Sequence, residues 1–98
     1  MIRVVVQDEK GNDVSEPVDV STGVLAHPDD LRFTCLRFVD PYGDTVFNRV
    51  HLVPLLEDLR LLRESCNSSQ EESVLNQIEA LIERCRGEPH LYLKLIGD

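Results

Sequence analysis

The sequence contains no apolar run close to the roughly 18 residues that a membrane-spanning helix needs. The apolar stretch at its start ends at Gln7, which is too short for the core of a signal peptide. Neither a membrane span nor secretion finds support in the sequence. We therefore expect a cytoplasmic protein.

Cysteine is also scarce: the chain has only Cys35, Cys66 and Cys85, an odd number without a Cys-x-x-Cys pair. This is not the spacing of a zinc site, and single cysteines in apolar patterns behave as small hydrophobic residues. Cys66 and Cys85 fall at opposite ends of two predicted antiparallel helices, so we do not expect them to share a metal ion with His51 or His90. We predict no metal and no cofactor, in a reducing compartment.

Basic residues are few: 10 lysines and arginines stand against 18 aspartates and glutamates, giving a net charge of −8. Residues 1–30 hold two bases, Arg3 and Lys10, and the seven acids Asp8, Glu9, Asp13, Glu16, Asp19, Asp29 and Asp30. Phosphate contact requires a basic stripe, so nucleic acid and anionic membranes are disfavoured as partners. A basic protein partner is favoured, because opposite charges steer association. The alternative is that the charge only keeps the protein in solution.

Short catalytic and nucleotide-binding motifs are absent as well. The chain has no G-x-S-x-G, no P-loop, no H-E-x-x-H and no dinucleotide fingerprint. Many active sites are built without a short motif, so this absence counts weakly against an enzyme.

What the sequence does contain is a pair of amphipathic stripes between residues 52 and 85. Apolar residues recur there at spacings of three and four, which places them on one helical face. The first stripe comprises Leu52, Leu55, Leu56, Leu59, Leu62 and Cys66, and the second Val74, Leu75, Ile78, Leu81, Ile82 and Cys85. The polar connection between them indicates an antiparallel helical hairpin. Pro54 predicts a start near Val53, and Gly87 predicts the end of the second helix.

Five β-strands are predicted around this hairpin, four before it and one after it. Residues 2–7 and 14–20 pair across the turn 8–12, and Pro17 places the second strand at a sheet edge or at a bulge. The remaining strands are residues 31–40, which have the best strand pattern, residues 45–47 and residues 90–96.

The element order ββββααβ groups strands and helices separately, which is typical of an α+β fold. We predict a single domain over residues 1–98, with a mainly antiparallel sheet of about five strands and the helical hairpin packed on one face. The last strand is expected to run opposite to the fourth, because each of the two helices reverses the direction of the chain.

The turn from Asp40 to Asp44, with the sequence DPYGD, is the first candidate binding site. A tyrosine on a rigid turn suits an interface anchor, so Tyr42 is its central residue. The carboxylates of Asp40 and Asp44 would complement arginine or lysine on a partner. The alternative is a stable turn whose tyrosine covers the edge of the sheet.

The loop of residues 21–30 is the second candidate. It brings His27, Asp29 and Asp30 within four residues, a set that suits a divalent cation or general acid–base chemistry. The two aspartates also suit an acidic surface for a basic partner. The alternative is ordinary solvated turn chemistry.

Three classes of function remain. The first, which we favour, is a non-catalytic protein-binding module that presents its acidic turns to a basic partner. In size, charge and lack of catalytic motifs the chain is similar to small acidic α+β proteins that neutralise bacterial toxins, which implies an inhibitor or immunity type of role. The second is a self-associating structural domain that pairs a strand edge or the helix surface around Leu61. The third is a small-ligand binder or enzyme with its site at the 21–30 loop.

Overall fold

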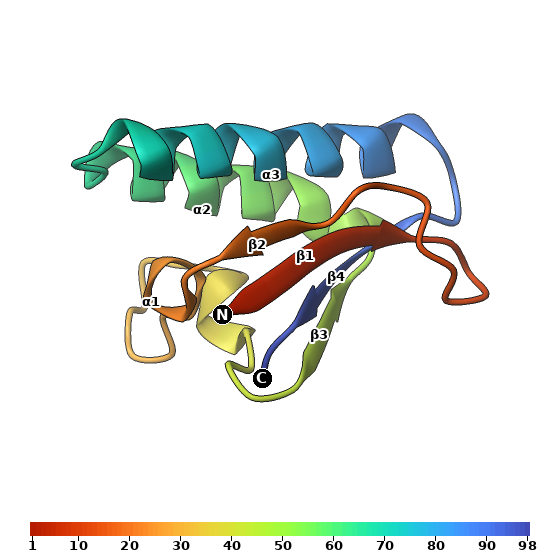
Figure 1. Cartoon of the computed structure of the whole chain (residues 1–98), viewed down its shortest axis with the longest axis horizontal. Helices are drawn as coiled ribbons and strands as arrows, with labels where there is room; N and C mark the ends of the chain where they lie inside the picture. The colour runs from red at the N-terminus through yellow and green to blue at the C-terminus, as the bar shows by residue number, and fades with distance from the viewer.

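The computed structural model describes all 98 residues as an antiparallel sheet with two long helices on one of its faces (Figure 1). The elements along the chain are β1 (Ile2–Gln7), β2 (Val18–Val20), α1 (Thr22–Leu25), η1 (Leu36–Phe38), β3 (Asp44–Phe47), η2 (Arg49–His51), α2 (Leu52–Glu64), α3 (Ser69–Gly87) and β4 (Tyr92–Ile96), where η denotes a 3-10 helix. The strands lie in the order β2-β1-β4-β3, and every neighbouring pair is antiparallel. The predicted α+β class is confirmed, but the sheet has four strands and not five.

The helical hairpin forms where the two stripes predict it. Asn48 caps the start of η2, which leads into α2, because its side chain accepts a hydrogen bond from the Val50 amide at 3.0 Å while its own amide donates to His51 Nδ1 at 3.0 Å. Ser68 caps α3 by accepting from the Glu71 amide at 3.1 Å. The second helix ends at Gly87, as predicted.

The core lies between the sheet and the hairpin. Alternate residues of β1 and β4 point into it, as a strand with one covered face requires, and the stripe residues of both helices meet them. Fully buried members from the strands and helices include Ile2, Val4, Leu93, Leu95, Leu55, Leu59, Leu75 and Ile82. The opposite face of the sheet has no helix over it (Figure 1).

Residues 31–40 are not a strand, and the prediction is wrong there. The segment is a loop that contains η1, and its buried residues are Phe33, Cys35, Leu36 and Val39. The two-residue alternation changes phase at the adjacent buried pair Cys35 and Leu36, where the loop enters the 3-10 turn.

Asp58 on α2 is the physical reason that this loop leaves the sheet. Its carboxylate is 99% buried, because only 1% of the residue remains exposed. It accepts hydrogen bonds from the amides of Thr34 (3.0 Å), Cys35 (2.7 Å) and Leu36 (2.9 Å). Backbone donors that a strand would offer to a neighbouring strand are taken by one side chain, so the loop packs along α2.

Two further segments differ in extent from the prediction. The second strand covers only Val18–Val20, although it lies at a sheet edge as Pro17 predicts. Residues 21–30 are mostly loop, but they include the single turn of helix α1. β3 and β4 run antiparallel, as expected. No helix combines the length and hydrophobicity that crossing a bilayer would require.

Candidate protein-binding surface

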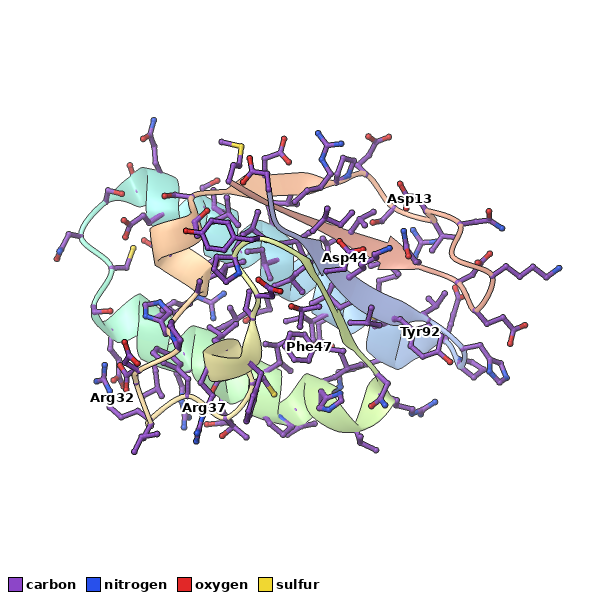
Figure 2. The ribbon with its side chains drawn as sticks, turned by 90° about the horizontal axis from the view of Figure 1, so that it is seen from below. Asp13, Arg32, Arg37, Asp44, Phe47 and Tyr92 are labelled. Atoms are coloured by element: carbon purple, nitrogen blue, oxygen red, sulfur yellow. The ribbon has the colours of Figure 1, made fainter.

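The uncovered face of the sheet is lined by alternate residues of its strands, and Figure 2 shows it from below. Polar pairs lie across neighbouring strands: Arg3 with Asp19 at 3.1 Å, Gln7 with Asp13 at 2.7 Å, and Lys94 with Asp44 at 3.5 Å. Between these pairs are the apolar side chains of Val5, Val46, Tyr92 and Ile96. The face is therefore a mixed surface whose charges are largely matched in cross-strand pairs.

The 40–44 turn at one end of this face is held by its own hydrogen bonds. The Asp40 carboxylate accepts from the Tyr42 amide at 2.9 Å, and the Asp40 amide donates to Thr45 Oγ1 at 3.0 Å. Asp40 thus fixes the turn on both sides, in the manner expected of aspartate at the first position of a turn.

The last residues of the chain fasten the same turn from outside. The Gly97 amide donates to the Gly43 carbonyl at 2.8 Å, and the Asp98 amide donates to the Pro41 carbonyl at 3.2 Å. Gly97 is required at this approach, because a Cβ there would overlap the Pro41 carbonyl. The Asp98 carboxylate in turn contacts the N-terminal ammonium of Met1 at 3.0 Å. Both ends of the chain therefore lie beside the turn (Figure 1).

Tyr42 projects from this fixed turn with 83% of its surface exposed. The alternative in which its ring covers the sheet edge is therefore wrong. Two residues further along β3 from Asp44, Val46 is 53% exposed on the same face. We call the set Asp40, Tyr42, Asp44, Val46 and Asp98 the Tyr42 surface.

Sequence reasoning identified three members of the Tyr42 surface and missed two. Asp98 joins it only through the backbone bonds between the chain end and the turn, which no local pattern reveals. Val46 could have been found, because alternation in 44–47 places it on the same face as Asp44 when Phe47 points inward.

The 27–30 segment is arranged differently. Arg32 donates to both carboxylate oxygens of Asp30, with the shortest distance at 2.8 Å, and this pairing lowers the pKa of Asp30 from 3.8 to about 2. His27 is engaged within the loop, since its Nε2 lies 2.7 Å from the Val24 carbonyl and its ring packs on Phe33. Asp29 is exposed. The three side chains are not collected around a common centre.

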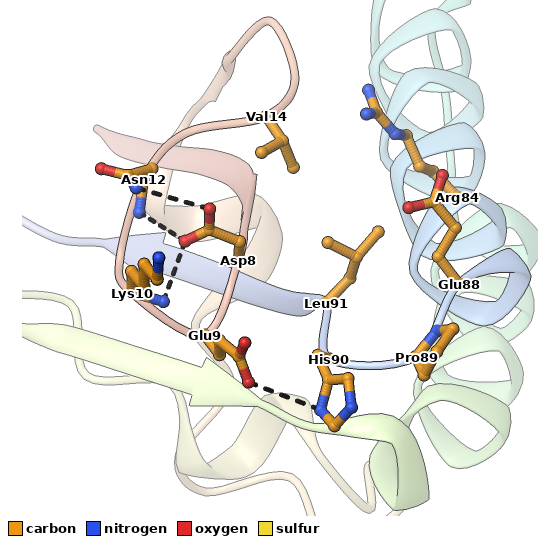
Figure 3. A pocket seen from close by; sticks show the side chains of 10 residues that line it. All are labelled: Asp8, Glu9, Lys10, Asn12, Val14, Arg84, Glu88, Pro89, His90 and Leu91. Carbon is orange, nitrogen blue, oxygen red and sulfur yellow. Dashed lines mark hydrogen bonds and ion pairs between the residues drawn. The ribbon is translucent and has the colours of Figure 1, made fainter.

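The largest surface hollow, about 430 Å³, lies elsewhere, between the β1–β2 loop and the α3–β4 connection (Figure 3). Glu9 and His90 approach each other across it at 3.7 Å, and His90 has a left-handed backbone with φ of 65°. Asp8 is occupied by the amides of Lys10 and Asn12, which lower its pKa. Figure 3 shows the remaining charged side chains pointing in different directions, so no ligand chemistry is defined there.

The structure also has no cluster of side chains for metal binding and no reactive buried thiol. Nowhere do three or more His, Cys, Asp or Glu side chains converge as a metal would require. Cys35 and Cys85 are buried, and burial raises the pKa of each thiol to about 11. Such thiols remain protonated near neutral pH and are poor nucleophiles.

Comparisons with protein-family models, with curated proteins and with solved structures find no match for this chain.

Proposed function

We propose that this protein is a non-catalytic binding module that presents the Tyr42 surface to a basic protein. The observation that supports the proposal best is the exposure of Tyr42, 83%, on a turn that is held by hydrogen bonds with Asp40, Gly97 and Asp98. Because the backbone of the turn is already fixed, binding would cost only the side-chain freedom of Tyr42, and its ring offers a large contact area.

Charge supports the same choice of partner. Asp40, Asp44 and Asp98 lie in or beside the turn that carries Tyr42, within a molecule whose net charge is −8. Two cations neutralise part of this group: Lys94 contacts Asp44 at 3.5 Å, and the N-terminal ammonium of Met1 contacts Asp98 at 3.0 Å. The remaining negative potential would steer a basic surface toward Tyr42, and arginine or lysine would then contact both the carboxylates and the ring.

The partner can be captured with the protein coupled to a resin through Cys66. This thiol lies in the α2–α3 connection of the helical layer, away from the turn below the sheet (Figure 1). Lysate from the source organism is applied at low salt, and bound protein is released by a salt step and identified by mass spectrometry. We expect one stoichiometric basic protein. Release of only background proteins at every salt concentration would overturn the proposal.

Variants then locate the surface on the captured partner. Tyr42→Ala is expected to weaken binding by about tenfold or more, as truncation of an aromatic anchor does. Asp44→Asn is expected to slow association severalfold at low salt and less at high salt. Asp29→Asn makes the same charge change on the other candidate turn and serves as the matched control. If Asp29→Asn slows binding and Asp44→Asn does not, the partner uses the 27–30 segment instead.

A further inference from the structure

β3 forms an edge of the sheet and pairs only with β4. Antiparallel strands alternate between residue pairs that exchange two backbone hydrogen bonds and pairs that exchange none. The register places Asp44 opposite Ile96, and therefore Gly43 opposite Gly97. Because the Gly97 amide donates to the Gly43 carbonyl, that pair is a bonded one, and so are Thr45–Leu95 and Phe47–Leu93.

It follows that the amides and carbonyls of Asp44 and Val46 point away from β4, toward the open edge. No backbone or side-chain hydrogen bond to these four groups exists elsewhere in the chain, because the bonds outside the regular elements do not include them. β3 has neither a proline nor a lysine, which commonly protect edge strands. The opposite edge, β2, is shorter and directly follows Pro17.

The side chains beside the open edge have a defined chemistry. Asp44 and Val46 lie two residues apart on the uncovered face, with 56% of the Asp44 side chain and 53% of Val46 exposed. A strand added next to β3 would place its own side chains directly across from these two. A basic residue fits opposite Asp44, and an apolar residue fits opposite Val46.

We propose that the partner of the Tyr42 surface supplies an extended segment that adds to the open edge of β3 as a fifth strand. This inference rests on the proposed binding function and names its mode: backbone hydrogen bonds to Asp44 and Val46, with a basic and an apolar side chain alternating along the outer face. The Tyr42 ring, on the turn that leads into the same strand, contacts the side chain beyond the basic one.

A second copy of this chain is a poor occupant of the same edge. β3 has the sequence DTVF and contains no base, so pairing two copies of it offers Asp44 no cation beyond Lys94 of its own chain. Each copy would also bring a net charge of −8 to the other. The charge pattern of the edge therefore favours a basic segment from a different protein.

The probe for the test is a soluble peptide with the core Lys-Thr-Val-Thr-Lys, flanked by serine and glycine. Its outer-face order, lysine, valine, lysine, is the same in both directions, so either strand orientation brings a lysine to Asp44. A second peptide has the same sequence but an N-methyl group on every backbone amide of the core, which keeps its charge and removes the strand-pairing donors on both edges.

Amide hydrogen exchange of the full chain tests strand addition, because it compares the amides of β3 that bond to β4 with the amides at its open edge. In the free protein, the amides of Thr45 and Phe47 should be protected, and those of Asp44 and Val46 should exchange freely. With the first peptide bound, Asp44 and Val46 should gain at least about tenfold protection, and the methylated peptide should bind at least about tenfold more weakly. If Asp44 and Val46 stay unprotected in the complex, strand addition is excluded.

The variant Val46→Pro gives an independent check. It removes an amide that β4 does not use and places a ring at the open edge, where proline is tolerated. Val46→Thr keeps the amide and is its control. We expect Val46→Pro to fold and to lose at least about tenfold in peptide affinity, with Val46→Thr close to the parent.

The outcomes separate the two proposals. Equal binding of both peptides, weakened by Tyr42→Ala, would retain the Tyr42 surface and overturn strand addition. If neither peptide binds, strand addition by a segment with this charge pattern is overturned. The proposed function would still be supported by a captured basic protein whose binding is weakened by Tyr42→Ala.

Discussion

At the scale of single residues, Asp58 holds the loop of residues 34–36 in place, although the sequence pattern around it does not indicate this role. It lies between Leu55 and Leu59 of the first stripe, where a carboxylate is usually interpreted as part of a solvated face. In the structure it is buried and accepts three backbone amides of the preceding loop. Its partners lie more than 20 positions away, so no local pattern could have identified its role.

Asp58→Ala should destabilise the protein by about 3 kcal/mol, because it leaves three amides without an acceptor and opens a small cavity. Asp58→Asn, which keeps one acceptor oxygen, should lose less. Glu57→Ala, at the exposed neighbouring position, is the control and should change stability by less than about 0.5 kcal/mol. Urea unfolding followed by circular dichroism measures all three. A loss below about 1 kcal/mol for Asp58→Ala would show that the loop is held by other contacts.

Asp30 provides a prediction for pH. Its folded-state pKa, about 2, is below the ordinary 3.8 because Arg32 donates to its carboxylate. The ion pair therefore stabilises the fold fully above the unfolded pKa and loses this effect as the pH falls through about 2. In a carbon-detected NMR titration, Arg32→Gln should return the pKa of Asp30 toward 3.8. Arg37→Gln, which removes a base without a carboxylate partner, should leave the titration of Asp30 unchanged.

At the scale of elements, the sequence was most informative where its periodicity was long. Each helical stripe spans several turns, so both helices were predicted, with the start of α2 and the end of α3 correct to within one residue. The start of α3 was not predicted, because the polar residues 69–73 before the second stripe form its first turn. β1, β3 and β4 were also predicted. The segment 31–40 was not, because its short alternation of apolar residues is typical of a strand, whereas three of its amides bond to Asp58 of α2.

The hairpin is also the element whose disruption should unfold the molecule. Leu59 and Ile78 are buried on the facing stripes of α2 and α3. Leu59→Asp or Ile78→Asp should each cost about 4 kcal/mol or more, since each buries a charge without a partner. Gln77→Asp, at an exposed position of α3, tests the same substitution in solvent and should leave melting nearly unchanged. Cooperative melting near the parent temperature in both buried variants would contradict the packing described here.

At the scale of the whole molecule, net charge indicated the class of partner we propose, and it could not locate the surface. The order β2-β1-β4-β3 brings the chain ends to the 40–44 turn and leaves β3 at an edge. The positions of the chain ends and of β3 depend on pairings between residues about 50 or more positions apart, as between β3 and β4. They also depend on which two strands form the edges of the sheet. These are properties of topology that the strand patterns do not contain.

Global unfolding should control the reactivity of the cysteines. Cys35 and Cys85 are buried with thiol pKa values raised to about 11, while Cys66 is only half-buried in the α2–α3 connection. At pH 8 we expect a colorimetric thiol reagent to modify one cysteine rapidly in the folded protein and all three in guanidinium chloride. Cys66→Ser should abolish the rapid reaction. Two rapid reactions in the folded parent would show that one of the buried sites is open to solvent.

The meeting of Met1, Asp98 and the 40–44 turn determines how this protein can be fused to others. A tag, reporter domain or linker attached at either end starts beside Tyr42 and would shield it, so a terminal fusion used as bait would compete with the ligand it was meant to find. The two ends are close enough to be joined by a short linker, and opening the chain between Cys66 and Ser68 would yield a circular permutant. Its new termini would lie in the helical layer, where a fusion leaves the sheet face free.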